Sequence, residues 1–153
     1  MGLELGIDAY RATGAALAMP YYLGLLGDAL AQRGQHRDAK SVLDDALAIA
    51  AAGNDRCHQA ELYRLKGELA CNGGDCSSDA EELLLGSIDT ARCQESKAFE
   101  LRATTQLADF FQTTGRRSAA IEALGAAYNN FSEGFMMPDL CDAKKLLDEL
   151  QSA

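Results

Sequence analysis

Two cysteines, Cys71 and Cys76, lie five positions apart around an Asn-Gly-Gly-Asp core, and acidic residues follow them in the stretch CNGGDCSSDAEELLL, residues 71–85. Three interpretations fit these residue types. Two thiols are half of a zinc site, a neighbouring pair of thiols can be oxidised reversibly, and Gly-Gly is a common way to reverse the direction of a chain. The stretch alone does not decide between these three interpretations, so the decision depends on the elements around it.

The two histidines, His36 and His58, lack the partners that catalysis or metal binding would need. Neither is accompanied by a serine, cysteine or carboxylate in a recognisable nucleophile or zinc motif. His58 directly follows Cys57, and adjacency in sequence does not position a base against a thiol. The phosphate loops GxGxxG and GxxxxGK[ST] are absent as well. We therefore predict a non-enzymatic protein with no catalytic site, no metal and no cofactor.

The length and composition favour one helical domain. The chain has 153 residues, enough for a hydrophobic core without crosslinks. Leu and Ala dominate, Trp is absent and there are 2 prolines, which predicts an all-α fold. Lys and Arg number 14 against 23 Asp and Glu, a formal net charge of −9, and the basic residues are scattered. This acidic balance disfavours binding to a nucleic-acid backbone.

No stretch of the sequence resembles a signal peptide or a membrane anchor. A charged N-terminal region followed by an apolar stretch and a small-residue cleavage site is absent, and no apolar run approaches the roughly 20 residues of a membrane helix. The 5 cysteines are an odd number and are spread along the chain. We expect a soluble, cytoplasmic protein that keeps its thiols reduced and does not bind membranes.

A pattern of small and apolar residues recurs three times. Equivalent positions in the three copies are 40 or 41 residues apart. The recurring positions are a glycine at Gly34, Gly74 and Gly115, an alanine at Ala39, Ala80 and Ala120, a leucine at Leu43, Leu84 and Leu124, and a small residue at Ala46, Ser87 and Ala127. A fixed period of this length indicates a helical-repeat architecture.

Each copy of the pattern predicts two helices joined by a tight turn. Upstream of the glycine, apolar and small residues at spacings of three and four form one stripe of a helix. The glycine ends this helix because it takes the left-handed conformation that other side chains resist. The alanine lies in the second helix, where a larger side chain would push the two helices apart.

This pattern resembles the tetratricopeptide repeat (TPR). In the first copy the family positions are filled by Gly27, Gly34, Ala39, Leu43 and Ala46. Three positions depart from the family pattern: Lys66 stands where leucine is usual, Ser87 replaces the last alanine, and Ala108 replaces the first glycine. The resemblance implies a right-handed solenoid of helical hairpins with about seven to eight helices, in which longer links between repeats explain the period near 40.

A narrower resemblance rests on four strings. They are YRATGAALAMPYYLGLLGDAL at 10–30, AELYRLKGELA at 60–70, FELRA at 99–103 and FSEGFMMPDLCDAKKLLDEL at 131–150. In this order they are similar to the C-terminal TPR region of bacterial class III adenylate/guanylate cyclases and of ATPase-containing transcriptional regulators. Those proteins carry their catalytic and DNA-binding domains elsewhere, and neither is present here. The resemblance therefore implies only the repeat scaffold, in a regulatory setting.

We predict one TPR-like domain over residues 1–153. Helices are expected at about 17–33, 36–52, 56–72, 78–93, 97–114 and 117–131, which pair into repeat 1 (17–52), repeat 2 (56–94) and repeat 3 (97–131). A start near Met19 suits Pro20, which a helix tolerates only in its first turn. A further helix at 3–14, stopped at Gly14, resembles the second half of a preceding repeat. It is either a cap or part of a longer solenoid.

The C-terminal residues 138–151 are predicted to form a capping helix. Asp139 as N-cap with Asp142 resembles a capping box. The apolar stripe of this helix is Leu140, Ala143, Leu147 and Leu150. A solenoid needs such a cover because an open last repeat would expose its apolar face to water. We interpret the preceding FSEGFMMPDL, residues 131–140, as packing beneath this helix, with an exposed docking patch as the alternative.

The first helix of each repeat lines the concave surface of such a solenoid, where peptides usually bind. The predicted groove residues are Tyr21, Leu25, Asp28 and Gln32, then Glu61, Arg64, Leu65 and Glu68, then Arg102, Thr105, Asp109 and Gln112. Asp28, Glu68 and Asp109 share one repeat position, so we expect an acidic row flanked by Arg64 and Arg102. The row either selects a partner that carries Lys or Arg or is an ordinary solvated helix face.

These features predict a non-catalytic module that binds a protein or peptide segment in this groove. The alternative is a regulatory or sensory segment of a multidomain cyclase or ATP-dependent transcriptional regulator, acting through intramolecular contacts. A small enzyme would need a pocket of convergent ionisable groups. Neither nucleic acid nor membrane is an expected partner, and self-association through exposed terminal helices stays open.

The repeat assigns the cysteine stretch to the turn inside repeat 2. Gly74 aligns with the turn glycines of the other two repeats, which places Cys71 in the last turn of a helix and Cys76 in the loop. Ser77 or Ser78 is positioned to cap the next helix. The repeat brings no further metal ligand nearby, so a turn is favoured over a metal site. Reversible oxidation of the two thiols stays open.

Overall fold

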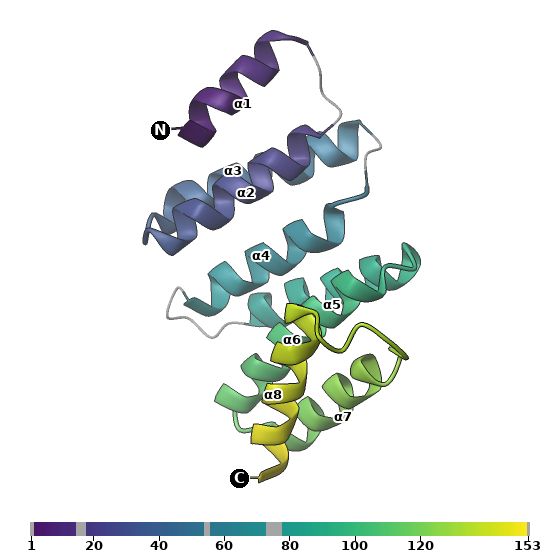
Figure 1. Cartoon of the computed structure of the whole chain (residues 1–153). Helices are drawn as coiled ribbons and strands as arrows, with labels where there is room; N and C mark the ends of the chain where they lie inside the picture. Colours follow the sequence, from purple (N-terminus) through teal and green to yellow (C-terminus); the bar gives the residue numbers. More distant parts are fainter. Residues whose placement is uncertain (1, 15–17, 54–55, 73–77, 153) are drawn as a thin grey trace.

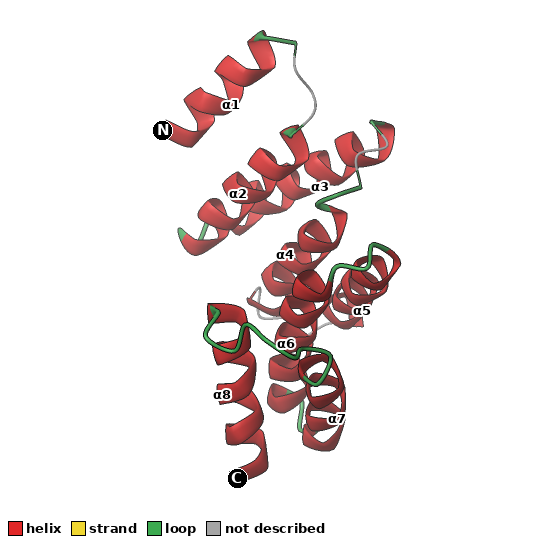
Figure 2. Cartoon of the chain, turned by 45° about the vertical axis from the view of Figure 1, so that its right-hand side comes forward, coloured by secondary structure: helices red, strands yellow, loops and turns green. Residues whose placement is uncertain are grey.

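The computed structural model describes residues 2–14, 18–53, 56–72 and 78–152, apart from the side chains of residues 3, 4, 11 and 78. Within these ranges the chain forms eight helices and no strand (Figures 1 and 2). The helices are α1 (Gly2–Ala12), α2 (Met19–Gln32), α3 (His36–Ala52), α4 (Gln59–Asn72), α5 (Ser78–Cys93), α6 (Lys97–Thr113), α7 (Arg117–Tyr128) and α8 (Pro138–Ser152). The predicted all-α class is confirmed.

The helices α2 to α7 pair into three hairpins, α2 with α3, α4 with α5 and α6 with α7. Each later hairpin packs its first helix on the hairpin before it, so α4 contacts α2 and α3, and α6 contacts α4 and α5. Figures 1 and 2 show the hairpins stacked one after another, with the two termini at opposite ends. Because α2, α4 and α6 follow one another along the stack, their side chains share one continuous surface.

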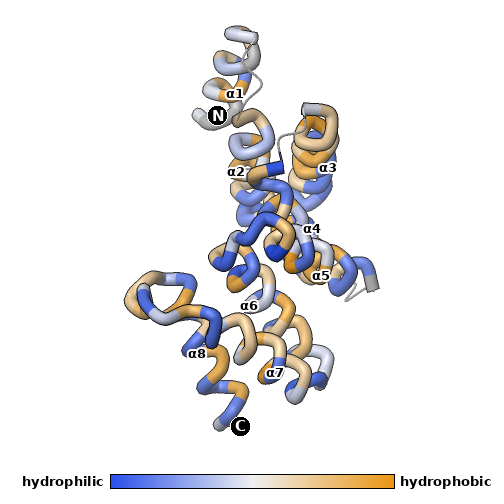
Figure 3. The backbone as a smooth tube through the Cα atoms, turned by 90° about the vertical axis from the view of Figure 1, so that its right-hand side faces the viewer, coloured by the Kyte–Doolittle hydropathy of each residue, from blue (hydrophilic) through white to orange (hydrophobic). Residues whose placement is uncertain are grey.

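The core consists of two apolar clusters. One lies mainly on α2, α3 and α4 and includes Leu23, Leu43 and Leu62. The other lies on α5 to α8 and includes Leu84 and Leu124. In Figure 3 apolar and polar residues alternate along the helices, as expected for helices that bury one stripe. No helix in the described part of the chain is both long and apolar enough to span a bilayer.

Small residues set the spacing within the hairpins. The alanines at the shared repeat position, Ala39, Ala80 and Ala120, are each 0% exposed. The same holds for Ser87, whose hydroxyl donates a hydrogen bond of 2.6 Å to the carbonyl oxygen of Ala60. Ser87 therefore replaces the usual alanine without leaving its buried hydroxyl unpaired.

Three turns between helices share one hydrogen-bond pattern. In each, a backbone N–H donates to the carbonyl oxygen five residues earlier, at 2.9 Å for Gln35, 2.9 Å for Ser96 and 2.7 Å for Arg116. This is the Schellman arrangement, in which the residue before the donor is left-handed. That residue is Gly34 at φ +76°, Glu95 at φ +54° and Gly115 at φ +76°. The helix-ending role predicted for Gly34 and Gly115 is confirmed.

The terminal helices pack on the ends of the stack. Helix α1 buries Ile7 and places the Tyr10 ring 5.3 Å from the Tyr22 ring of α2. Helix α8 packs on both α6 and α7 and buries the whole stripe predicted for it, Leu140, Ala143, Leu147 and Leu150. This stripe covers the last hairpin as expected for a cap.

Several predicted boundaries at helix ends are wrong. Helix α4 begins at Gln59, three residues late, because a turn closed by the Gln59 N–H on the Arg56 carbonyl precedes it. Helix α7 ends at Tyr128 because the two asparagines that follow form a turn. The predicted start of α8 at Pro138 is confirmed, and proline suits a first helical position because its φ is fixed and its N–H is missing. Asp139 therefore lies inside the first turn and is not the N-cap.

The segment before α8 is packed at one end and exposed at the other. Phe131 is half-buried against the second core cluster, in agreement with the packing interpretation. That interpretation is wrong for Met136 and Met137, which are 92% and 60% exposed. Both methionines follow Gly134 in a turn, where φ is +79° and the carbonyl accepts a 2.8 Å hydrogen bond from the Met137 N–H.

Candidate functional site

The first helices of the three hairpins meet at a pocket of about 350 Å³. Its apolar lining consists of Pro20, Gly24, Leu25, Leu62, Leu65 and Phe99, with Tyr21 and His58 as aromatic neighbours. Its polar lining consists of Asp28, Glu61 and Arg102. Tyr21 and Leu25 on α2 remain 42% and 41% exposed. An apolar edge therefore faces solvent beside an open pocket, the arrangement expected of a surface that covers itself by binding.

Aromatic rings form one wall of this pocket. The centroid of the Tyr21 ring lies 4.9 Å from that of His58 and 5.5 Å from that of Tyr22. The Nδ1 atom of His58 is buried and has no hydrogen-bond partner among the described residues. This imidazole therefore serves as a packing surface that still has an unused polar atom.

A second pocket of about 290 Å³ continues the surface toward α8. It is lined by Glu61, Arg64, Arg102, Thr105, Gln106, Asp139 and Asp142. Glu61 and Arg102 line both pockets, so the two form one groove that is apolar between α2 and α4 and polar between α4, α6 and the start of α8. We refer to these two joined pockets as the groove.

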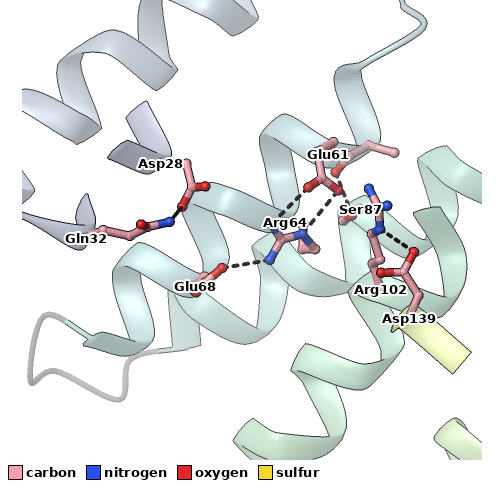
Figure 4. A network of polar contacts seen from close by, with 9 residues as sticks. Asp28, Gln32, Glu61, Arg64, Glu68, Ser87, Arg102 and Asp139 are labelled. Carbon is pink, nitrogen blue, oxygen red and sulfur yellow. Dashed lines mark hydrogen bonds and ion pairs between the residues drawn. The ribbon is translucent and has the colours of Figure 1, made fainter. Parts of the chain in front are cut away.

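Arg64 is the centre of an ion-pair network in the groove (Figure 4). Its guanidinium donates to both oxygens of Glu61, at 2.9 and 3.1 Å, and to Glu68 at 2.7 Å. Burial of the guanidinium lowers the pKa of Arg64, but the hydrogen bonds and charges of Glu61 and Glu68 outweigh burial and raise it. Two carboxylates thus share one fixed cation, and the network holds a net negative charge.

Arg102 joins the last hairpin to the capping helix. Its Nε donates a 2.8 Å hydrogen bond to Asp139 of α8 (Figure 4). Its guanidinium lies 5.9 Å from the centre of the Phe99 ring. The charge of Arg102 is therefore balanced by Asp139 at the polar end of the groove. Asp142, one turn further along α8, is exposed and makes no ion pair within the described residues.

The structure brings most of the predicted groove residues together. Those that line the groove are Tyr21, Leu25, Asp28, Glu61, Arg64, Leu65, Arg102 and Thr105. Gln32 and Glu68 line a small adjoining hollow of about 70 Å³, which Asp28 also lines. Asp109 and Gln112 are exposed on α6 and line none of these three spaces. Of the predicted acidic row, Asp28 and Glu68 are therefore neighbours, and Asp109 lies apart from them.

Sequence reasoning missed several lining residues. His58 and Phe99 occupy the same repeat position, three residues before Glu61 and Arg102, so the repeat register contained a signal for them. Gln106 lies next to the predicted Thr105. Asp139 and Asp142 belong to α8, outside the three aligned copies, and periodicity therefore had no means of placing them in the groove.

The cysteine stretch is only partly described. Cys71 lies half-buried in the last turn of α4, as predicted. Gly74, Cys76 and Ser77 lie outside the described residues, as does the side chain of Ser78, so their predicted roles stay predictions. In the ranges that the structure describes, no three His, Cys, Asp or Glu side chains are grouped to hold a metal ion.

The stacked hairpins have a TPR-like helical-repeat fold. The chain is similar in structure to a putative kinesin light chain of Podospora anserina with nearly identical TPR-like repeats, at a TM-score of 0.69 and 17% sequence identity, over 97% of this chain and 74% of that one. At this identity the likeness shows the fold alone. No protein-family model matches the sequence, and no curated protein matches it either.

Proposed function

We propose that this chain is a non-catalytic interaction module that holds a protein or peptide segment in the groove. The observation that carries the proposal is the open apolar pocket beside the exposed Tyr21 and Leu25. The pocket draws side chains from α2, α4 and α6, so one occupant contacts all three hairpins.

The free energies of the individual contacts determine which kinds of contact such an occupant needs for useful affinity. Burying one Leu or Phe side chain contributes about 1.5–3 kcal/mol, whereas a millimolar Kd already corresponds to about 4 kcal/mol. An apolar anchor alone therefore binds too weakly to be useful. The occupant has to combine the anchor with polar contacts, and the polar half of the groove lies directly beside the apolar half.

The same groove could be the binding site in the regulatory alternative, in which the chain acts through intramolecular contacts. The four strings that resemble the TPR region of cyclases and ATPase-containing regulators support a setting in which the occupant belongs to the same polypeptide. Binding would then restrain a catalytic or DNA-binding domain. A segment of the parent polypeptide that binds the isolated chain, and that loses this binding with the groove variant below, would favour this version.

The test is a selection of peptides from a random 12-residue phage library on the immobilised full chain. Selected peptides are then titrated against the parent, Leu25→Ser and Leu85→Ser. Leu25 and Leu85 are 41% and 44% exposed, on α2 and α5, so the pair is matched in chemistry and exposure and differs in location. We expect Leu25→Ser to weaken binding about tenfold and Leu85→Ser to leave it within twofold. The proposal would be contradicted if the selected peptides bound Leu25→Ser as tightly as the parent, or if the selection gave no binding peptide.

A further inference from the structure

Resting on this proposed function, we infer that the occupant of the groove is a basic segment. Its apolar side chain enters the pocket between α2, α4 and α6, and a Lys or Arg close to it in sequence meets a carboxylate at one end of the groove. Asp28 lies at the apolar end and Asp142 at the polar end.

Carboxylates outnumber cations in the groove. Its charged lining consists of Asp28, Glu61, Asp139 and Asp142 against Arg64 and Arg102. Arg102 is balanced by Asp139, and Arg64 is shared by Glu61 and the adjoining Glu68. The surface that remains for a ligand is therefore negative.

The carboxylates at the two ends of the groove have no cation of the described chain paired with them. The carboxylate of Asp28 accepts a 3.0 Å hydrogen bond from the neutral amide of Gln32, and within the described residues it has no cationic partner. Asp142 has no cationic partner there either. Asp28 lies beside Leu25 and Leu65, where apolar neighbours keep part of the solvent away and strengthen its attraction for a cation. A basic side chain at either end gains an ion pair without breaking one.

The pairing of both arginines disfavours the opposite kind of partner. An acidic segment would have to compete with carboxylates of the chain itself, which already pair with both guanidiniums. The Arg64 side chain is 16% exposed and is held by three hydrogen bonds, so an incoming anion would have to displace Glu61 or Glu68. The chain thus disfavours anionic ligands and accepts cationic ones.

The net charge of −9 attracts any cation over some distance, so the test has to separate the groove from the whole surface. The probes are the fluorescein-labelled peptides recovered from the phage library, together with versions in which each Lys or Arg is replaced by Gln. They are titrated against Asp28→Lys, Asp142→Lys and Asp45→Lys. Asp45 is exposed on α3, outside the groove, and its substitution changes the net charge by the same amount. Thermal melts by circular dichroism check that each variant is folded.

We expect the recovered peptides to combine an apolar residue with Lys or Arg. Asp28→Lys or Asp142→Lys should weaken them about tenfold, Asp45→Lys less than twofold, and replacement of the basic residue by Gln should remove the sensitivity to these substitutions. Two results would contradict the inference of a basic segment without contradicting the groove function. In one, the peptides lose affinity for Leu25→Ser but are neutral or acidic; in the other, they bind Asp28→Lys and Asp142→Lys as tightly as the parent. Peptides that bind Leu25→Ser as tightly as the parent would contradict the groove function itself.

Discussion

Gly27 of α2 lies directly against Leu43 of α3, so closely that a Cβ at position 27 would be 2.7 Å from Leu43 Cγ and Cδ2. Gly67 and Leu84 repeat this relationship in the next hairpin at 2.8 Å. Carbon atoms in contact prefer about 3.5–4.0 Å, so a side chain at either glycine would collide with the leucine. In the third hairpin Ala108 takes this position and is 0% exposed. That hairpin therefore accommodates a methyl group which the first two exclude.

Gly27→Ala and Gly67→Ala are expected to lower the free energy of unfolding by about 1–3 kcal/mol, because the methyl group forces the facing leucine out of place. Gly86→Ala and Gly125→Ala are the controls. Both lie inside helices, and apart from their chain neighbours and the backbone of their own helix no described atom lies within 4 Å of the position that their Cβ would take. These controls are expected to gain about 0.5–1 kcal/mol from helix propensity. Urea unfolding of the four variants measures the difference, and a common sign for all four would show that the leucine contact is unimportant.

Ala80→Leu and Ala120→Leu test the repeat register itself. Both alanines are 0% exposed between the helices of a hairpin, so three additional carbon atoms overpack the site and should destabilise the chain by about 1–3 kcal/mol. Ala48→Leu, at an exposed position of α3, should stay within about 0.5 kcal/mol. Thermal melts provide the comparison. If Ala80→Leu and Ala120→Leu both have the same melting temperature as the parent, these alanines are not at the helix contact.

The fold was largely predictable because its period is carried by residues that have few substitutes. A glycine at a left-handed turn and an alanine at a close helix contact both resist replacement, and Gly34 and Ala39 therefore mark their hairpin in the sequence. The turn at Glu95 has the same geometry without glycine, so no residue type in the sequence indicates a left-handed turn there. Methionine exposure after Gly134 was missed for another reason, since an apolar residue in a loop is buried or exposed according to tertiary contacts alone.

The groove was predictable where its residues follow the repeat and unpredictable where they do not. The partners of Arg64 lie three positions before and four positions after it on one helix, a spacing that the sequence displays openly. Arg102 instead pairs with Asp139, across two helices whose packing the sequence does not display. His58 and Phe99 share a repeat position but not a residue type, so the recurrence of residue types does not mark them as groove residues.

Glu95→Gly is expected to stabilise the protein. A left-handed conformation costs a residue with a side chain about 1–2 kcal/mol, and the greater freedom of glycine in the unfolded chain takes back about 0.4–1 kcal/mol. The net gain should therefore lie between about 0 and 1.6 kcal/mol. Gly34→Ala and Gly115→Ala, at the equivalent turns, should instead lose stability. Urea unfolding of the three variants decides, and a loss of stability in Glu95→Gly would mean that the Glu95 side chain contributes more than its backbone strain costs.

Asp44 should make the stability of the first two hairpins depend on pH. Its carboxylate accepts hydrogen bonds from Lys40 on the same helix, at 2.9 Å, and from Lys66 on α4, at 2.5 Å. Partial burial raises the pKa of Asp44, but the two lysines outweigh burial and lower the pKa below its ordinary value of 3.8. Because the folded pKa is the lower one, the stabilisation is complete above about pH 4 and is lost as the pH falls through the folded pKa. Lys66, which replaces the usual leucine, thus links two hairpins by charge.

Asp44→Asn is therefore expected to lower the free energy of unfolding at pH 7 by no more than about 1 kcal/mol, since the pair is partly solvated. The difference from the parent should shrink below pH 4, where the parent carboxylate also becomes neutral. Asp45→Asn is the matched control, because Asp45 is the exposed neighbour on the same helix and forms no ion pair within the described residues. Urea unfolding from pH 7 to pH 2.5 measures both. A deficit in Asp44→Asn that persists unchanged at pH 2.5 would assign the effect to lost hydrogen bonds, because a charge effect has to disappear when the carboxylate is protonated.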